Sequence, residues 1–384
     1  MTTPPSESPD GSSTKQELLE PSYKRGRSKV AVIRTSPERL LDDTADLLHT
    51  AEYDRILPKD ATTIVKDNIS WHLHYPSANT TPWQLEGMVR TMRQDGYDDV
   101  IGVHNRTVVT DASLGDANNK FRGVYERYEI PTYDNFSPDV EWIVYEPKGK
   151  MLVLDKIFPD GIRIPKMFIG KNIVHLPTVK THVYTTTTGA MKNAFGGLLK
   201  ENRHYCHSDI HATLVDLLRI QQEIHPGIFS LKDGTICGDG AGPRAMMPYV
   251  KDYMLASDDC VAIDAVAGKM MGFDPLSDLE YVRLAHEEGL GCGDVNEIEI
   301  VGEDISDVDF GFEVNYHFAS KVGRSIWYGP LKPLERLLFR TPLVKLFIIG
   351  SALYHDRYWY PYVGMKRRAE VMKSPWGQLF EQYD

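Results

Sequence analysis

The chain has few cysteines and no motif that would organise them. Only four occur in 384 residues, Cys206, Cys237, Cys260 and Cys292, and no two of them form a Cys-x-x-Cys pair. This spacing excludes a zinc ribbon and a cysteine-ligated iron–sulfur cluster. We therefore expect four free thiols in a reducing compartment, the cytoplasm.

Several other signals are missing. The phosphate-binding pattern G-x-x-x-x-G-K-S/T does not occur, and there is no internal repeat. The first residues lack the apolar core of a signal peptide. The longest apolar stretch, Leu343 to Tyr354, contains a lysine and is too short to cross a bilayer. We accordingly expect a globular protein without a membrane span.

Charge is distributed unevenly. The net charge of −11 argues against general nucleic-acid binding. Residues 321–384, by contrast, carry eleven Lys or Arg against five Asp or Glu, and 12 of the 39 aromatic residues. Within this tail, Arg336, Arg340 and Lys345 alternate with apolar residues between Leu334 and Leu353, a pattern that fits peripheral contact with a membrane. A lid, an interface, or simple packing onto the main body are the alternatives.

The order of apolar segments predicts an α/β fold with a largely parallel sheet flanked by helices. Residues 1–28 are polar and predicted to be disordered, residues 29–311 form the α/β domain with two lobes divided near residue 150, and residues 312–384 form an aromatic and basic helical appendix. Strands are predicted at 29–34, 62–68, 98–104, 141–146, 151–157, 172–177 and 297–302. Helices are predicted at 40–48, 82–94, 210–224, 257–271 and 279–288.

The densest group of chemically capable residues lies between His175 and His211. The segment VKTHVYTTTTGAMKNAFGG follows a predicted strand, and ligands of open α/β sheets bind beyond the carboxyl ends of strands. There, side chains and exposed amides can converge on an anion. The candidates in this segment are Lys180, His182, Thr188, Gly189, Lys192 and Asn193. A threonine-rich surface loop with solvated lysines is the alternative.

Three histidines follow at helical spacing. If the segment is helical, His204, His207 and His211 lie on one face and can meet one metal ion or one substrate. Imidazole ligands suit nickel, zinc or iron. The alternative is a polar helix start whose histidines form ordinary hydrogen bonds.

Four residues elsewhere complete the candidate site. Lys66 and Asn68 stand at the end of a predicted strand, where they can hold a carboxylate. Arg244 follows the glycine-rich turn GDGAGPR and can clamp an anion. Asp264 lies inside a helix among alanine and valine, so it is either buried and paired or faces a cleft.

The segments KDN, HLPTVKTH, TGAMKNAFGGL, GDGAGP and SDDCVAIDAVAGKMMGFDP together resemble the family called domain of unknown function 362. The resemblance covers roughly residues 29–305 and implies a fold and a site region more firmly than a reaction. Many members of the family carry a ferredoxin-like module with iron–sulfur clusters, and this chain has no such cysteine run. It also shows KDN where the family usually has Lys-Pro-Asn.

A fainter likeness extends to nickel-dependent lactate racemases. Those enzymes use a catalytic histidine, a lysine ten residues later that carries the cofactor, and a further histidine as a metal ligand. In this sequence His182, Lys192 and His207 have similar spacing. The likeness implies acid/base chemistry, with a divalent metal as the cofactor to consider.

The leading hypothesis is an enzyme of the isomerase or epimerase type that acts on a small anionic substrate such as a carboxylate. His182 would act as general acid or base, Lys192 would hold the anion or a cofactor, and His207 would be a second base. An oxidoreductase or lyase that uses the same pocket is the second hypothesis. A non-enzymatic ligand-binding or membrane-surface scaffold protein is the third.

Overall fold

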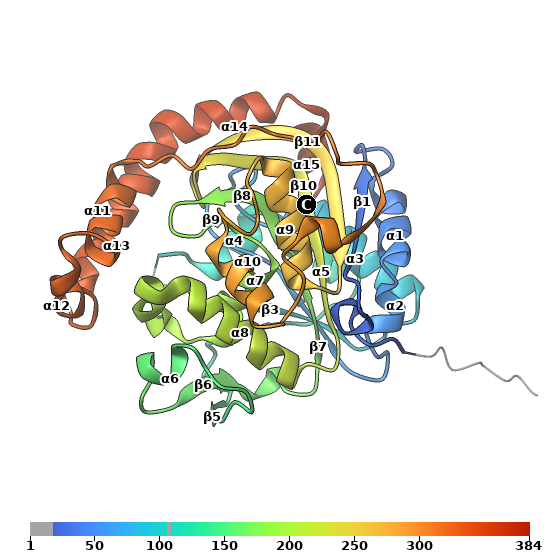
Figure 1. Ribbon diagram of the computed structural model, residues 1–384. Coiled ribbons are helices and arrows are strands. Elements are labelled where there is room, and N and C mark those ends of the chain that lie inside the picture. The colour runs from blue at the N-terminus through green and yellow to red at the C-terminus, as the bar shows by residue number, and fades with distance from the viewer. Residues whose placement is uncertain (1–17, 106–108) are drawn as a thin grey trace, which may run out of the picture.

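The computed structural model describes residues 18–105 and 109–384, and its centre is one 10-stranded sheet (Figure 1). Along the sheet the strands follow the order β12-β1-β11-β10-β7-β2-β3-β4, and β8 pairs with β10 and with β9. Most pairings are parallel, which confirms the α/β class. The strands are β1 (Lys29–Arg34), β2 (Thr63–Lys66), β3 (Val100–His104), β4 (Thr132–Asp134), β7 (Asn172–His175), β8 (Thr178–His182), β9 (Thr186–Thr187), β10 (Ile228–Ala241), β11 (Ala245–Ser257) and β12 (Glu299–Gly302).

Alternation along the strands gives the sheet a core on each face. Val30 and Val32 point into one core while Ala31 points into the other, because successive strand side chains face opposite ways. Both faces are thus apolar and covered by helices, as parallel sheets require. One face carries α7 (Ala190–Leu198), α8 (Ile210–Ile224), α9 (Cys260–Met271) and α10 (Glu280–Glu287). The other carries α1 (Leu40–Thr50), α2 (Tyr53–Ile56), α3 (Pro82–Gln94) and α5 (Phe121–Arg127).

Two expectations about organisation need correction. β7 lies between β2 and β10, so strands from both sides of residue 150 share one sheet, and the sheet shows no division into two lobes there. Residues 1–17 lie outside the described residues, but residues 18–28 are ordered rather than disordered. Ser22 is buried, and its hydroxyl donates to Asp258 at 2.6 Å, while the Ser28 hydroxyl donates to Asp259 at 2.5 Å.

Secondary structure follows the sequence closely in most places. Thr81 begins α3 with a capping box, since its hydroxyl accepts the Gln84 amide at 3.3 Å. One assignment was wrong: residues 151–157 contain a short helix, α6 (Leu154–Ile157), rather than a strand, because the carboxylate of Asp216 accepts the backbone amides of Leu152, Val153 and Leu154. The remaining elements of the body are η1 (Ser22–Arg25), α4 (Ala112–Asn118), β5 (Trp142–Tyr145), β6 (Ile162–Pro165), η2 (Lys166–Phe168), η3 (Glu201–Asp209) and η4 (Val295–Glu297).

The C-terminal segment is helical, and its two parts behave differently. The first part, which we call the arm, projects beside the body in Figure 1. It comprises α11 (Phe318–Trp327), η5 (Lys332–Leu334), α12 (Glu335–Phe339), α13 (Val344–Ala352) and the π-helix η6 (Leu353–Gly364). No helix among the described residues is both long and apolar enough to cross a membrane.

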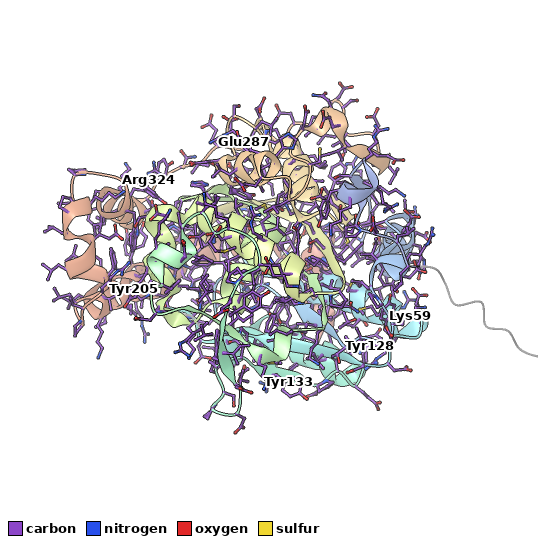
Figure 2. All side chains as sticks on the ribbon, turned by 60° about the horizontal axis from the view of Figure 1, so that its bottom comes forward. Lys59, Tyr128, Tyr133, Tyr205, Glu287 and Arg324 are labelled. Carbon is purple, nitrogen blue, oxygen red and sulfur yellow. The ribbon has the colours of Figure 1, made fainter. Side chains whose placement is uncertain are left out.

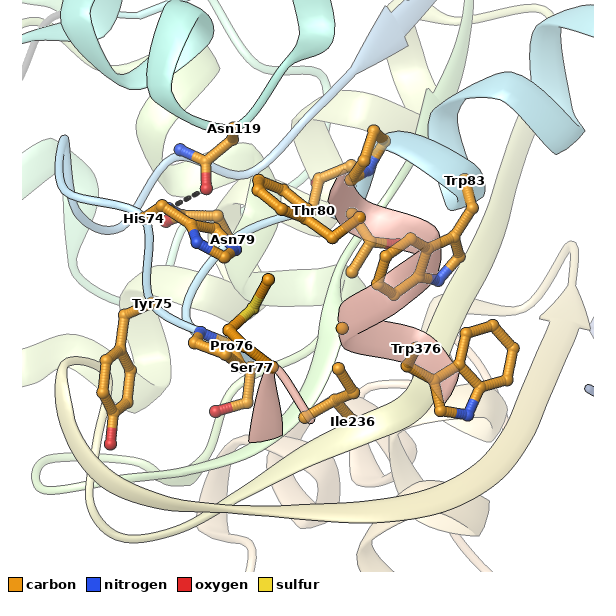
Figure 3. Close-up of a pocket in the computed structure, with 15 residues that line it drawn as sticks. His74, Tyr75, Pro76, Ser77, Asn79, Thr80, Trp83, Asn119, Ile236 and Trp376 are labelled. Carbon is orange, nitrogen blue, oxygen red and sulfur yellow. Dashed lines mark hydrogen bonds between the residues drawn. The ribbon is translucent and has the colours of Figure 1, made fainter. Parts of the chain in front are cut away.

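The second part, α14 (Met365–Val371) and α15 (Pro375–Gln382), returns to the body. Trp376 is buried, its ring lies 5.4 Å from that of Trp83, and its indole N–H donates to Asp252 at 2.7 Å (Figure 3). Burial of a tryptophan with its polar atom satisfied anchors a chain end firmly. The helices that follow the arm, α14 and α15, therefore attach it to the body.

A buried ion pair joins the sheet to the helices over the candidate site. The Lys232 ammonium of β10 donates to the Asp264 carboxylate of α9 at 2.6 Å, and both side chains are almost fully buried. Removing one partner of such a pair leaves an uncompensated charge in the interior. Lys232→Met is therefore expected to lower the stability by about 3–5 kcal/mol, measured as the midpoint of chemical unfolding.

The matched control is Lys166→Met. Lys166 also forms an ion pair, with Glu141 at 2.7 Å, but both partners are exposed. Its removal is expected to change stability by less than about 1 kcal/mol. Equal unfolding midpoints for the two variants would contradict the structural role given to Lys232.

Candidate functional site

The candidate site lies where the chain reverses its direction across the sheet. From β2 the chain passes through α3 to β3 on one side, and from β7 it passes through α7 and α8 to β10 on the other. Such a switch point leaves a crevice at the carboxyl ends of the two neighbouring strands, the usual place for ligands in this architecture. Here those ends carry Lys66 and His175.

Asn193 joins the two strand ends. Its amide nitrogen donates to the Lys66 carbonyl at 2.8 Å and lies 3.4 Å from His175 Nδ1. His175 is further held by Gln221, 2.7 Å from Nε2, and burial lowers its pKa to about 3. Asn193, a predicted ligand-binding residue, thus joins the ends of β2 and β7. Because Asn193 belongs to α7, the same contacts hold α7 over these strand ends.

Lys66 is buried at the carboxyl end of β2. Its ammonium donates to the Asp67 carbonyl at 2.5 Å and lies 3.6 Å from the Asp67 carboxylate. Burial lowers the pKa of Lys66. The predicted binding residue Lys66 is therefore already paired with its neighbour.

On the β3 side of Lys66 lies an acidic group that the sequence analysis missed. His104 Nδ1 lies 3.0 Å from Asp67 and its Nε2 lies 3.8 Å from Asp116, while the Tyr125 hydroxyl donates to Asp67 at 3.1 Å. Burial disfavours the imidazolium, but the two carboxylates outweigh it and raise the pKa of His104. A cavity of about 270 Å³ opens beside this group. One sequence feature pointed to this group: like Lys66 and His175, His104 is the last residue of its strand.

On the other side of Lys66 the structure brings together His182, Lys192 and His207. All three are close enough to interact electrostatically, and His211 and Lys180 are also within range of His182. No carboxylate forms an ion pair with Lys180 or Lys192 in the described part of the chain. The crevice therefore divides into a carboxylate side and a cationic side.

The hydrogen bonds of His182 define its tautomer. Its Nδ1 accepts the backbone N–H of Tyr184 at 3.1 Å, and because a backbone amide can only donate, this nitrogen carries the lone pair. Burial and the positive charge of Lys192 hold the pKa of His182 well below its usual value. At neutral pH the ring is uncharged and presents Nε2–H as a donor.

His207 has the opposite tautomer. Its Nδ1 lies 3.0 Å from the His204 carbonyl, which can only accept, so Nδ1 carries the proton and Nε2 the lone pair. Burial lowers the pKa of His207 to about 4. The ring stacks on Trp327 of the arm, with ring centres 5.2 Å apart, and this fixes its orientation.

Lys192, on α7, is the cation of this group without a protein partner. Its ammonium lies 5.9 Å from the centre of the Phe195 ring, and within the residues that the structure describes it makes no ion pair or hydrogen bond. Burial, together with the nearby Arg203 guanidinium, lowers the pKa of Lys192 to about 8. An anion is the partner that this arrangement lacks.

Lys180 and Asn68 are brought together, but they bind each other. The Lys180 ammonium donates to Asn68 Oδ1 at 2.8 Å, to the Ser70 hydroxyl at 3.2 Å and to the Ala78 carbonyl. Three oxygen acceptors satisfy all three N–H groups of an ammonium. Lys180 therefore holds the loop after β2 against β8, and its role as a substrate ligand stays a prediction.

Of the two alternatives for Asp264, the structure shows the buried and paired one. Its carboxylate accepts the amides of Ala190 at 2.7 Å and Met191 at 3.2 Å, and so neutralises the first turn of α7. Gly189 allows this approach, since a Cβ there would lie 2.0 Å from Asp264 Oδ1. Thr188 donates its amide to the Lys180 carbonyl at 3.0 Å. The predicted Thr188 and Gly189 thus shape the turn rather than bind a ligand.

The expected set of three metal-binding histidines is not formed. His204 Nε2 lies 3.0 Å from the Phe339 carbonyl, His207 bonds as described, and His211 Nε2 lies 3.6 Å from Glu280. Across residues 18–105 and 109–384, no three His, Cys, Asp or Glu side chains are grouped to hold a metal ion. The spacing i, i+3, i+7 fails because η3 interrupts the helix before α8 begins.

Arg244 is separated from this group. It lies in the tight turn between β10 and β11 and lines a different cavity, beneath the arm. Its expected role in the same site as His182 is therefore corrected. The four cysteines are unpaired, as expected.

Comparison with known proteins agrees with the resemblance seen in the sequence. The model of the family described as domain of unknown function (DUF362) matches residues 63–269, and the chain belongs to this family. Over 153 residues the chain is 26% identical to a thylakoid-associated protein of Synechocystis. That match covers 38% of this chain and 46% of the relative, so the chain spans less than half the length of this relative. A crystal structure of a protein from Thermotoga maritima aligns over 71% of this chain and 62% of its own, at 10% identity and a TM-score of 0.37.

The lowered pKa of Lys192 has a measurable effect on stability. Below pH 8 the folded state carries a partly buried charge that no described carboxylate pairs with, and between pH 8 and 10.5 the unfolded chain binds the proton that the folded chain has released. Stability of the wild type therefore rises with pH in this window, relative to a variant without the group. Lys192→Met is expected to unfold at a higher temperature than the wild type at pH 7, with the difference shrinking as pH approaches 10.5.

Thermal unfolding of both proteins from pH 6 to 10.5 measures this effect. The exposed Lys150 provides the control, since Lys150→Met should leave the unfolding temperature nearly unchanged throughout. A difference between wild type and Lys192→Met that is independent of pH would contradict the assignment of an unpaired charge to Lys192.

Proposed function

We propose that the protein is an enzyme that binds a small carboxylate at Lys192 and removes a proton from the adjacent carbon, as isomerases and epimerases do. The observation that carries the proposal is the cationic side of the crevice, where Lys192 has no carboxylate partner and stands beside two imidazoles of opposite tautomer. Two neutral imidazoles, one with a free lone pair and the other with a free N–H, offer the proton acceptor and the hydrogen-bond donor that acid/base catalysis uses.

The anion is expected because of the charge balance. Lys192 interacts with Arg203, and its positive charge depresses the pKa of both His182 and His207. A bound carboxylate would supply the missing negative charge and move the pKa of all three groups back toward ordinary values. Binding would thereby turn His207 into a stronger base at the moment the substrate arrives.

The two histidines suit complementary steps. His207 Nε2 would take the proton from the carbon next to the carboxylate, and the electron pair of the broken C–H bond would move onto the substrate oxygens. His182 Nε2–H would donate a hydrogen bond to that developing negative charge, as a neutral imidazole can. Return of a proton to carbon from His207 or from solvent completes the exchange.

The test is hydrogen–deuterium exchange at carbon. The full chain is incubated in heavy water with hydroxy acids, sugar acids and amino acids, and nuclear magnetic resonance detects loss of the signal next to the carboxylate. One or more acids are expected to exchange with wild type, and His207→Asn and Lys192→Met are each expected to slow exchange by at least about a hundredfold, the usual contribution of a positioned acid or base.

His49→Gln is the matched control, because His49 lies on α1 and pairs with Asp95 far from the crevice. It should exchange substrate at the wild-type rate. Wild-type exchange by His207→Asn would remove the proposed base, and absence of exchange across the whole panel would remove the reaction class.

The four unpaired thiols fit a reducing compartment such as the cytoplasm.

A second, non-enzymatic candidate function concerns the outer side of the arm. Ile349 and Leu353 are 55% and 58% exposed, lie four residues apart on one face of α13 and the start of η6, and do not line the cavity beneath the arm. Contiguous exposed apolar side chains of this kind mark interaction surfaces. Exposed Lys332 and Arg340 accompany them, and the side chain of Arg336 lies outside the described residues. We propose that this face rests on an anionic membrane surface, and the name of the thylakoid-associated relative supports the idea.

Sedimentation with vesicles tests this function. The wild-type chain should pellet with vesicles of phosphatidylcholine and phosphatidylserine, less so in high salt, because apolar insertion and charge act together. A double variant with Ile349 and Leu353 each changed to Asp should stay in the supernatant. Leu114→Asp, at an exposed leucine of α4, is the control and should pellet like wild type. Pelleting of the double variant would contradict membrane contact by this face.

A further inference from the structure

A second cavity lies between the arm and the body. Its volume is about 390 Å³, within the range of small-molecule sites. α11, α12, α13 and η6 form its outer walls, while Val183, Tyr184 and the turn from Ala241 to Arg244 form the inner wall. In Figure 1 the arm stands beside the loop around β9, and in Figure 2 Arg324 of α11 lies on the same side of the molecule as Tyr205 of η3.

The walls supplied by the arm are mainly apolar and aromatic. The Phe339 ring stacks on Trp327 with centres 4.1 Å apart and lies 4.9 Å from Phe347. Phe318 and Val322 of α11 complete this lining. A hydrocarbon chain or ring is the ligand part that such a surface favours.

One charged group faces this apolar space from the body. Arg244 Nη2 donates to the Ser351 hydroxyl at 3.1 Å, whereas Nη1 is buried and has no hydrogen-bond partner. No carboxylate lies within ion-pair distance of Arg244 in the portion of the chain described, although Asp356 is near enough to act on its charge. Burial outweighs Asp356 and lowers the pKa of Arg244 to about 10, so it remains charged at neutral pH. A buried guanidinium with an unused donor calls for an acceptor.

The two histidines of the cavity do not compete for that acceptor. His355 Nδ1 lies 2.9 Å from the Ser351 carbonyl, so its Nε2 carries the lone pair, while His317 Nδ1 accepts the Ser320 amide at 3.2 Å and leaves the proton on Nε2. These two Nε2 atoms lie 3.4 Å apart and satisfy each other. Burial lowers the pKa of His317 to about 4 and that of His355 to about 2, so both are neutral.

We propose that this cavity binds a single-chain amphipathic carboxylate, with its head on Arg244 and its hydrocarbon tail among the aromatic side chains of the arm. One cation facing the cavity matches one negative charge, and the rest of the lining matches an apolar chain. Val183 and Tyr184 separate this cavity from His182 and His207, so the proposal does not depend on the acid/base chemistry inferred for those residues.

Titration calorimetry of the full chain with dodecanoate, below its aggregation concentration, tests the head-group contact, and dodecan-1-ol is the neutral comparison. Arg244→Gln should weaken dodecanoate binding on the order of tenfold or more, the usual effect of losing a charge-assisted hydrogen bond. Binding of the alcohol should change by less than about threefold. Equal weakening of both ligands, or an unchanged affinity for dodecanoate, would overturn the assignment of Arg244.

A second pair of variants tests the cavity without touching its charge. Gly350 lies in α13 on the cavity wall, and a Cβ added there meets no atom within 4 Å. Gly350→Ala should therefore bind both ligands like wild type, while Gly350→Phe should fill the cavity and abolish binding of both. Wild-type binding by Gly350→Phe, or no binding of dodecanoate by the wild-type chain, would exclude a site in this cavity.

Discussion

The site depends on one buried carboxylate. Asp264 receives the Lys232 ammonium from β10 and the first two amides of α7, and by these contacts it fixes the helix start against α9 and the sheet. Because α7 is short, its position over the switch point follows from this one contact and from Asn193 at the strand ends. Lys192 lies close to these two fixed residues, so the framework places its backbone over the switch point. Within the described residues no hydrogen bond or ion pair holds its ammonium.

Charges of opposite sign occupy different parts of the carboxyl edge of the sheet, with carboxylates near β3 and cations near α7. Around β3 the carboxylates Asp67 and Asp116 outweigh burial and raise the pKa of His104, whereas beside α7 burial, together with neighbouring cations, lowers the pKa of His182 and His207. Lys66 lies at the border and pairs toward the acidic side. Two imidazole environments with pKa shifts of opposite direction are therefore held on one framework. Among the described residues, no carboxylate forms an ion pair with Lys192 on the cationic side, and this makes it the side that favours an anionic ligand.

The sequence predicted the parallel sheet, its flanking helices and the central position of His182, Lys192 and His207, since these depend on local pattern and strand order. It did not predict β10 and β11, because Lys232 and Asp233 interrupt the apolar pattern of β10 and its glycines read as turns. Long-range pairing overrides local preference in such strands. The same limit applies to Asp264: its burial inside a helix was visible, but its partner Lys232 lies on another element and is recognised only in three dimensions. The tautomers of His182 and His207 depend on single backbone groups, which no spacing rule reveals.

The structure shows where the aromatic residues of the C-terminal segment lie: some belong to the main core and others to the arm. Trp376 and Phe380 belong to the main core, so the C-terminal end of the segment is part of the body, and the projecting helices form a loop held on both sides. The inner face of that loop carries Trp327, which stacks on His207, so the arm also orders one of the two imidazoles of the candidate site. The cavity under the arm meets the same region through Tyr184, whose ring centre lies 5.7 Å from those of both His182 and His207. Tyr184 and Trp327 therefore pack between the cavity and His207, so the two sites share these aromatic side chains as a common wall.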